Sequence, residues 1–398
     1  MVENMQVNRV RTWSRIDGID GLRALAIFFV LMNHVNMRLL FARLPYLKGL
    51  PPQLASSLVW QGQSGVQIFF AVSGFLITTT SINRWGNLSR IHIRDFYLLR
   101  FARIAPLLLT LLAVLSLLHV FHFKDFTVSK NVGGLRSALV AALTFRVGLL
   151  EATKGYLPGN WDILWSLSVE ETFYLFFPLA CYLLGRGKWL VVFLVMFVVL
   201  GPFGRTVLAH GNETWQEYSY LGGMDAIALG CLTALFAARR SFGRPALMIF
   251  VGIGSALLVL CLGFSREVNR LGLDSVGLGM TLLAVGTCML IVAAAQTRWQ
   301  APRIFNPLLV YGRRSYEIYL THMFIVFAFF NLFKRAGKPM SLIPLLFVAV
   351  IVLSGVLGEL VARFYSEPAN HWLRTRFGDG STTVAHKEEL IAVTVDCE

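Results

Sequence analysis

Several ionisable side chains of this sequence lie inside long apolar stretches, where they are costly unless they serve a function. The first stretch contains RALAIFFVLMNH, in which His34 follows Arg23 by eleven positions. At about 100° per residue, this spacing places both side chains on one helix face, about 16 Å apart along the axis. A charge at the bilayer centre costs about 2.5–3.5 kcal/mol on insertion scales, so both residues are functional candidates. Asp20, three residues before Arg23, could neutralise the guanidinium.

A second polar stripe occurs in WSLSVEETFYLFFP, which contains the adjacent carboxylates Glu170 and Glu171. Adjacent residues of a helix cannot face the same way, and Glu170 has Ser166 four positions before it and Tyr174 four positions after it. We therefore predict that Glu170 faces the protein interior and that Glu171 is the more doubtful member of the pair.

The depths of these groups predict a catalytic pair. If the first span begins at Leu22 and the fourth at Leu164, His34 lies about 12 Å and Glu170 about 9 Å from the same outer edge of a roughly 30 Å core. A carboxylate at this depth could orient the imidazole, which could then act as a general base. The alternative is that Arg23 snorkels to the cytoplasmic edge and His34 is a hydrogen-bonded core residue.

A third set of polar residues lies in GRRSYEIYLTHMF, where Ser315, Tyr319 and His322 share one helix face at i, i+4 and i+7. Counted from Arg314, His322 would lie about 10 Å from the cytoplasmic edge, so the two histidines would line one path at different depths. The alternative for His322 is a structural hydrogen bond between helices. Asp225 and Glu359 are also flanked by apolar residues, and each is expected to pair with a neighbouring helix.

The composition indicates which elements hold these groups. Of 398 residues, 56% are apolar and 15% charged, and the mean hydropathy is +0.63, which excludes a soluble globule. Apolar runs long enough to cross a bilayer predict an all-α, polytopic transmembrane bundle of about ten spans. The predicted spans are 22–41, 65–80, 104–121, 164–184, 189–203, 220–238, 246–264, 275–296, 315–333 and 342–362. The stretch 135–150, interrupted by Arg136 and Arg146, is expected to be an interfacial helix.

The charge distribution predicts the orientation. The net charge of +14 would suggest nucleic acid binding in a soluble protein, but membrane proteins collect Lys and Arg in cytoplasmic loops. Ten spans with both termini cytoplasmic place 21 of these residues inside and 14 outside, with Arg23 within the first span. The predicted domains are a cytoplasmic basic tail at 1–21, a membrane domain at 22–373 and a cytoplasmic polar tail at 374–398. The five cysteines form no CxxC pair, so neither a disulfide framework nor a metal site is expected.

The segment RIHIRDFYLLRFARIAP concentrates Arg90, Arg94, Arg100 and Arg103 in what we expect to be a short inside loop before the third span. Retention of positive charge on the cytoplasmic side would explain this cluster. Arginines and an aromatic residue at a helix start could equally bind a phosphate-rich cytosolic cofactor. The charge alone does not distinguish these hypotheses.

Six segments in this order resemble the integral-membrane acyltransferase-3 family, whose members transfer acetyl and other short acyl groups to sugars. They are IDGLRALAIFFVLMNH, GVQIFFAVSGFLIT, FYLLRFARIAP, WSLSVEETFYLFFP, YGRRSYEIYLTH and YSEP, and they extend from about Ile16 to Pro368. The resemblance implies that Arg23 and His34 match the Arg-x10-His signature of the family, in which the histidine is taken as catalytic.

The resemblance also implies roles for other residues. Ser73 and Gly74 would belong to a turn with the sequence SGF, Arg100 and Arg103 to a cytoplasmic arginine pair, and Glu170 to an SxE motif. The run SYxxYLxH contains three of the residues expected to line the site, which together are Ser73, Ser166, Ser168, Tyr174, Ser315, Tyr319 and His322.

Two departures from the family pattern are Gln67, where an acid is common, and Thr172, where Gln is common. Larger members carry an esterase-like domain after the membrane part. This sequence ends about 30 residues after Pro368, so we expect it to act on its acceptor without such a domain.

These observations predict a membrane O-acyltransferase of the bacterial inner membrane. Acyl-CoA, with acetyl-CoA as the expected co-substrate, would dock from the cytoplasm against Arg23, Arg100 and Arg103. A hydroxyl of an extracytoplasmic glycan or glycolipid would arrive from the other side, with His34 as general base and Glu170 fixing its tautomer. Transient acylation of His34 is a variant of this mechanism. The other hypotheses are a proton-coupled transporter or flippase of an anionic or glycosylated lipid, and a structural or sensory membrane protein.

Overall fold

The computed structural model describes residues 16–297 and 299–377 of the chain. Most of the predicted N-terminal tail, with Arg9, Arg11 and Arg15, and most of the predicted C-terminal tail lie outside these described residues, whereas 17–21 of the N-terminal tail belong to the first helix. Within them the chain is helical and contains no strand, which confirms the predicted all-α class.

Within residues 16–297 and 299–377, ten long apolar helices occur at the predicted positions. They are α1 (Asp17–Phe41), α3 (Gly62–Trp85), α4 (Ile93–Val120), α8 (Leu164–Leu184), α9 (Trp189–Arg205), α11 (Tyr220–Arg239), α12 (Arg244–Leu258), α14 (Leu278–Thr297), α16 (Ser315–Arg335) and α17 (Ile343–Val361). π-Helical segments, Val259–Gly263 and Ala362–Ser366, extend α12 and α17.

Shorter helices connect the long ones. They are α2 (Pro52–Val59), α5 (Gly134–Leu143), α6 (Val147–Lys154), α7 (Gly159–Asp162), α10 (Glu213–Tyr218), α13 (Ser265–Arg270), α15 (Asn306–Arg313) and α18 (Glu367–Phe377). Single 3-10 turns are Leu88–Arg90, Lys130–Val132, Val207–Ala209, Arg303–Phe305 and Met340–Leu342.

Nine helical segments of the described ranges are long and apolar enough to cross a membrane, which confirms a polytopic bundle. The remaining predicted span is α9, whose 17 residues cover only about 25 Å at 1.5 Å per residue. The stretch 135–150, expected to be one interfacial helix, forms parts of the two short helices α5 and α6, with a break at 144–146. Neither is long enough to span a bilayer.

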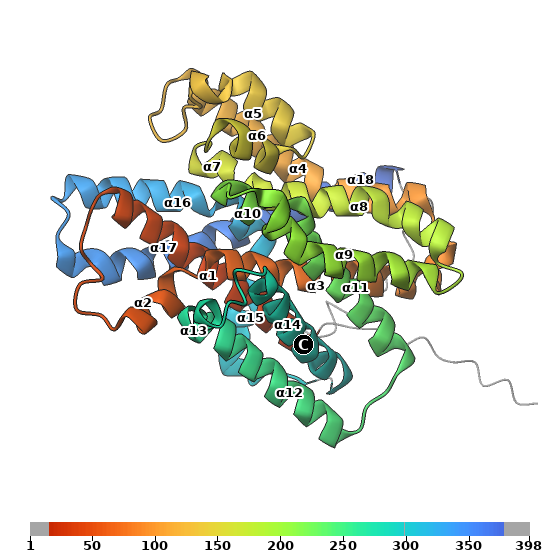
Figure 1. Ribbon diagram of the computed structural model, residues 1–398. Helices are drawn as coiled ribbons and strands as arrows, with labels where there is room; N and C mark the ends of the chain where they lie inside the picture. Colours follow the sequence, from red (N-terminus) through yellow and green to blue (C-terminus); the bar gives the residue numbers. More distant parts are fainter. Residues whose placement is uncertain (1–15, 298, 378–398) are drawn as a thin grey trace, which may run out of the picture.

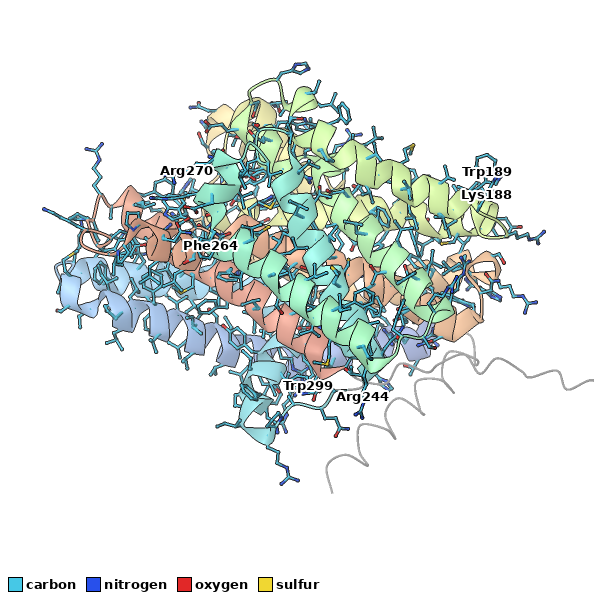
Figure 2. The ribbon with its side chains drawn as sticks, turned by 60° about the horizontal axis from the view of Figure 1, so that its bottom comes forward. Lys188, Trp189, Arg244, Phe264, Arg270 and Trp299 are labelled. Carbon is cyan, nitrogen blue, oxygen red and sulfur yellow. The ribbon has the colours of Figure 1, made fainter. Side chains whose placement is uncertain are left out.

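The long helices lie side by side with their ends at two opposite faces (Figure 1). Helices α16 and α17 form one pair, α12 and α14 another, and α5 and α6 stand at an edge of the bundle. Arg244 and Trp299 mark one end of the α12–α14 pair, and Phe264 and Arg270 mark the other (Figure 2). Aromatic and basic side chains at helix ends are typical of residues at membrane–water interfaces.

Helices α3 and α11 pack closely in the interior, and this contact corrects one expectation. Ser73 and Gly74, expected in a turn, lie in the middle of α3. A Cβ atom on Gly74 would lie 2.0 Å from the carbonyl oxygen of Ile227, so only glycine permits this approach of the two backbones. The SGF segment therefore serves close helix packing, and Ser73 reaches the site from a continuous helix.

We predict that Gly74→Ala destabilises the protein by about 1–3 kcal/mol, because the added methyl group forces α3 and α11 apart. The matched control is Gly252→Ala in α12, where an added Cβ meets no atom within 4 Å. Thermal unfolding in one detergent compares the two variants. Equal unfolding midpoints would contradict the packing role of Gly74.

Candidate functional site

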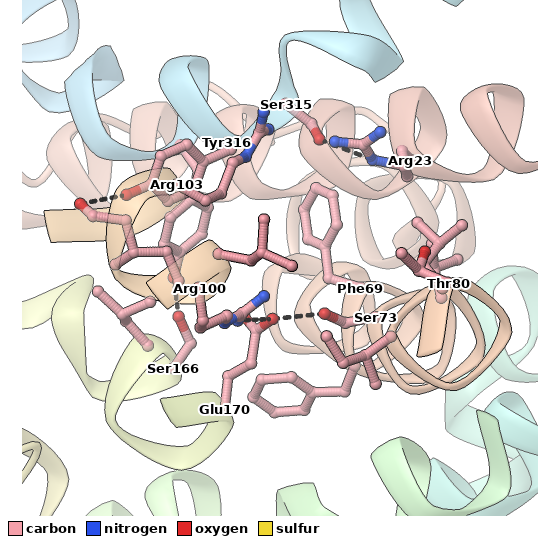
Figure 3. Close-up of a pocket in the computed structure, with 18 of the residues that line it drawn as sticks. Arg23, Phe69, Ser73, Thr80, Arg100, Arg103, Ser166, Glu170, Ser315 and Tyr316 are labelled. Carbon is pink, nitrogen blue, oxygen red and sulfur yellow. Dashed lines mark hydrogen bonds and ion pairs between the residues drawn. The ribbon is translucent and has the colours of Figure 1, made fainter. Parts of the chain in front are cut away.

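A pocket lies at one end of the bundle, where α1, α4 and α16 begin and α3 ends. Its volume is about 530 Å³, within the usual range for sites that bind small molecules and cofactors. Five arginines contribute to its wall: Arg23, Arg84, Arg100, Arg103 and Arg374. Figure 3 shows Arg23, Arg100 and Arg103 around the pocket, with Ser73, Ser166 and Glu170 on its wall. This concentration of guanidinium groups favours an anionic ligand.

Three of the four arginines of the predicted inside loop belong to a helix, and Arg90 ends the 3-10 turn that precedes it. Arg94, Arg100 and Arg103 lie within α4, which begins at Ile93, eleven residues before the predicted start of the span. Nothing between Ile93 and Ala105 breaks a helix, and Pro106 is accommodated inside α4. Arg100 and Arg103, three residues apart, therefore face the pocket together from one rigid element.

Arg100 forms the central ion pair of the pocket wall. Its Nη2 atom donates to Glu170 Oε1 at 2.7 Å and to Glu171 Oε1 at 2.6 Å, while its Nε atom donates to Glu171 at 2.9 Å. The guanidinium also lies over the Tyr174 ring, 4.0 Å from its centroid. Ser73 donates to Glu170, and the Tyr174 hydroxyl donates to Ser73 at 2.8 Å.

This arrangement corrects two expectations. Glu170 is bound to Arg100 and Ser73, and no hydrogen bond or ion pair joins it to His34 among the described residues, so the predicted His34–Glu170 pair is not formed. Glu171, the doubtful member, is the more buried of the two and binds the same guanidinium. The long, flexible Arg100 side chain lets two adjacent helix residues share one partner, which helix geometry alone did not predict.

Arg23 lies where α1, α15 and α16 meet. As predicted, it pairs with Asp20, at 3.5 Å, and its Nε atom donates to the Ser315 hydroxyl at 3.2 Å. A Cβ atom on Gly312 would lie 1.9 Å from the carbonyl oxygen of Asp20, so the end of α15 packs directly on the first turn of α1. Helix α16 therefore begins level with the Asp20–Arg23 turn, inside the bundle.

The position of α16 places the two histidines together. The ring centroids of His34 and His322 lie 4.9 Å apart in an edge-to-face arrangement, whereas we expected different depths. Sequence spacing specifies neither where α16 begins relative to α1 nor how the two side chains are directed, so it does not predict this contact. His322 is fully buried and His34 is partly exposed.

The hydrogen bonds of the rings fix their tautomers. His34 Nδ1 lies 2.8 Å from the carbonyl oxygen of Val30, and His322 Nδ1 lies 2.7 Å from that of Tyr319. A carbonyl oxygen can only accept, so each Nδ1 atom carries the proton and, in the neutral ring, each Nε2 atom has a free lone pair. The partner that orients His34 is therefore the backbone of its own helix.

The other predicted site residues divide into two groups. Ser166, Ser315 and Tyr319 line the pocket, and the Tyr319 hydroxyl bonds to Ser166 at 2.7 Å. Ser168 faces away from the pocket: its hydroxyl donates to Leu164 and accepts from the backbone of Val147 in α6. Tyr174 lies behind the wall, and neither histidine contributes to the pocket lining. Tyr319 separates the pocket from the histidines, with its ring 5.8 Å from that of His322.

The polar residues expected to pair between helices do so. Asp225 accepts hydrogen bonds from Arg205 at 2.8 Å and Thr281 at 2.7 Å, and Glu359 pairs with Arg314 at 2.7 Å. Gln67, which stands where the family commonly has an acid, donates to Asp225 at 3.0 Å. An amide is well suited to this position because it can donate to a carboxylate.

The pocket residues that were not predicted include Arg84, Tyr316 and Arg374. Arg84 lies in the last turn of α3 and makes no ion pair with any described residue, and the Tyr316 ring lies under Arg103 with its centroid 5.4 Å away. Arg374, predicted to lie in a polar tail, belongs to α18 and lines the pocket. Arg84 lies six positions before Arg90 in the same basic segment, so its charge gave a signal, whereas nothing local indicates that α18 returns to the pocket.

We predict that Arg100→Gln lowers the free energy of unfolding by about 3–5 kcal/mol, because it leaves the buried Glu171 and the partly buried Glu170 without a countercharge. The double variant Arg100→Gln/Glu171→Gln should regain part of this loss. Unfolding in detergent measures both, with the exposed Arg90→Gln as the control expected within about 0.5 kcal/mol of wild type. Similar stability of Arg100→Gln and Arg90→Gln would contradict this role.

A buried carboxyl at the opposite end of the bundle predicts a pH dependence. Glu151 in α6 is 1% exposed, and its Oε1 atom accepts from the backbone N–H of Leu157 at 2.9 Å. Burial, with a smaller contribution from the Asp162 carboxylate, raises the pKa of Glu151 from 4.5 to about 11. A carboxyl with a raised pKa stabilises the fold while it is protonated, and this contribution is lost as pH rises toward the folded-state value.

We therefore expect wild type to lose stability relative to Glu151→Gln between pH 6 and pH 9, by up to about 1.4 kcal/mol per pH unit. Unfolding midpoints across that range measure the difference. The exposed Glu213→Gln serves as a control that should follow the wild-type curve. Parallel curves for wild type and Glu151→Gln would show that Glu151 is ionised in the folded protein.

Comparison with known proteins relates this architecture to enzymes. O-acetyltransferase OatA of Staphylococcus aureus, in strains NCTC 8325 / PS 47, COL and MRSA252, is 26% identical to this chain over 379 residues. The match covers 89% of this chain and 57% of each relative, so the chain spans little more than half the length of these relatives. No solved structure matches the chain significantly.

The family comparison covers the helices that build the pocket and carry the histidine pair. A family model described as an acyltransferase domain matches residues 16–359, from the residue before α1 to the end of α17. The chain therefore belongs to the acyltransferase-3 family.

Proposed function

We propose that this chain transfers an acetyl group from acetyl-CoA to a hydroxyl group of a carbohydrate acceptor, with His34 as general base. The observation that carries the proposal is the hydrogen bond from His34 Nδ1–H to the Val30 carbonyl, 2.8 Å long, which leaves Nε2 as a proton acceptor. The partial exposure of His34 supports access for a substrate hydroxyl. The names of the O-acetyltransferase relatives support the acetyl group as the one transferred.

The pocket supports a phosphate-rich donor. Arg84 makes no ion pair within the described residues, and Arg103, 4.0 Å from Glu317, has a side chain 38% exposed, so both can bind phosphate oxygens. Arg100 is engaged by two glutamates and serves mainly to shape the wall. We therefore assign the phosphates of coenzyme A to Arg84 and Arg103 at the mouth, with Arg23 deeper in the pocket.

The chemical step then follows from the positions of donor and base. As the acceptor hydroxyl attacks the thioester carbonyl carbon, its proton passes to His34 Nε2 and a C–O bond forms. The C–S bond breaks as the tetrahedral intermediate collapses, and the departing thiolate takes the proton from the imidazolium. The products are the acetyl ester and free coenzyme A. Removal of a hydroxyl proton by such a base typically contributes about 10²- to 10⁴-fold to the rate.

The charge distribution supports the orientation. The pocket opens at the end of the bundle where α1, α4 and α16 begin, and the predicted cytoplasmic side carries 21 Lys and Arg residues against 14 outside. We place the pocket on the cytoplasmic side of the plasma membrane, where acetyl-CoA is available. The acceptor then approaches the histidines from the opposite side. Tyr319 must move for the thioester to pass from the pocket to His34.

We predict that His34→Gln lowers acetyl transfer about 10²- to 10⁴-fold, while acetyl-CoA still binds with an affinity within about twofold of wild type. Transfer of labelled acetyl groups to cell-envelope carbohydrate and binding of labelled acetyl-CoA are measured on full-length protein in lipid nanodiscs. His119→Gln, at the far end of α4, is the matched control.

Unchanged transfer by His34→Gln would exclude His34 as the base. If acetyl-CoA does not bind to wild type and the protein instead carries a glycosylated lipid across a liposome membrane, the transporter hypothesis replaces the acyltransferase proposal.

A further inference from the structure

On the side of the histidine pair away from the pocket, three elements meet. Arg38 lies one turn after His34 on α1, Met323 follows His322 on α16, and Gly159 begins α7. A Cβ atom on Gly159 would lie 2.5 Å from Met323 Cε and 3.2 Å from Arg38 Nη2. The backbone of α7 is therefore in direct contact with both helices beside the histidines.

The next residue of α7, Asn160, is buried with its hydrogen bonds unmade. Only 1% of Asn160 is exposed, yet neither its Nδ2 nor its Oδ1 atom has a partner among the described residues. Asn36, also buried, shows the usual situation: its Nδ2 donates to Val59 at 3.1 Å and its Oδ1 accepts from the Tyr46 hydroxyl at 2.5 Å. Buried polar groups without partners are rare in native proteins and call for a functional explanation.

Arg38 and His322 add unpaired atoms to the same region. The Arg38 guanidinium lies 4.5 Å from the centroid of the Phe327 ring and makes no hydrogen bond or ion pair with any described residue, and its Nε atom is buried. The Nε2 atom of His322 is buried without a partner, and its lone pair is free because Nδ1 carries the proton. Stacking on Phe327 thus holds Arg38 in place while its N–H donors stay available.

The chemistry of these atoms selects a ligand class. Arg38 and Asn160 Nδ2 donate hydrogen bonds, whereas Asn160 Oδ1 and His322 Nε2 accept them. A fully ionised phosphate or carboxylate could pair with Arg38, but it carries no donor for Asn160 Oδ1 or His322 Nε2. A sugar hydroxyl both donates and accepts, so a neutral saccharide can satisfy all four groups.

We propose that Arg38, Asn160 and His322 form the subsite that binds the hydroxyl groups of a neutral saccharide acceptor and presents one of them to His34. This inference rests on the proposed function and names its acceptor subsite. Donor and acceptor then reach the histidine pair from opposite directions, with Tyr319 between the donor pocket and the rings. Asn160 and Arg38 contact the acceptor, and His322 accepts from a second hydroxyl beside the one that reacts.

The test uses full-length protein in lipid nanodiscs and two neutral probes, chitotetraose and maltotetraose. Binding of each probe is measured calorimetrically, and acetyl transfer from labelled acetyl-CoA is measured separately. We expect at least one probe to bind, and Asn160→Leu and Arg38→Met to weaken that binding at least tenfold. The affinity for acetyl-CoA should remain within twofold of wild type.

A thermal readout separates binding from a structural role. Asn160→Leu removes unpaired polar atoms, so its unfolding midpoint should equal or exceed that of wild type. The matched control Asn36→Leu removes paired atoms and should lower the midpoint while leaving saccharide binding unchanged.

Three outcomes would overturn the proposal. The first is that Asn160→Leu binds the saccharide as tightly as wild type does. The second is that the unfolding midpoint of Asn160→Leu is as low as that of Asn36→Leu. The third is that the wild-type protein binds neither neutral probe but binds the anionic polygalacturonate. Saccharide binding that depends on Asn160, in a protein that does not bind acetyl-CoA, would support this subsite and reject the acetyl-transfer function.

Discussion

The ion pair of Arg100 with Glu170 and Glu171 holds the helices of the pocket wall in place. It joins α4 to α8, and the hydrogen bond from Ser73 to Glu170 adds α3, so three helices that carry pocket residues are linked through one partly buried cation. In an apolar interior each member of such a set depends on the others, because removing one leaves an uncompensated charge. The same constraint governs Arg205 with Asp225.

Arg100 and Arg205 thus have carboxylate partners, whereas Arg38 and several neutral polar atoms near the histidines have no hydrogen-bond partner among the described residues. Asn160 and His322 are buried among helices that pair their charges within the protein. An unpaired neutral group costs less to retain than an unpaired charge, so it can persist in a folded protein until a ligand satisfies it. This division distinguishes the residues that hold the bundle together from those that are available to a substrate.

Much of the fold could be predicted because apolar runs of about twenty residues determine helices in a membrane. Arg23, His34 and Tyr319 could also be singled out, since polar residues at helical spacing in such runs are conspicuous. The residues that they contact could not be predicted from the sequence. The contact of His34 with His322 depends on where α16 begins, and that position is set by Gly312 against Asp20, a contact far apart in sequence. The pairing of Glu170 with Arg100 depends on a side-chain conformation that spacing does not specify.

Helix α9 has a consequence for the surrounding lipid. Its 17 residues fall about 5 Å short of a roughly 30 Å hydrocarbon core, and Val192, Val195 and Val199 are exposed along its length. Acyl chains beside these valines must compress or tilt to match the shorter hydrophobic length, which costs fractions of a kcal/mol per Å. The bilayer beside α9 is therefore locally thinner than elsewhere around the protein. The protein should partition toward thinner regions of a heterogeneous bilayer.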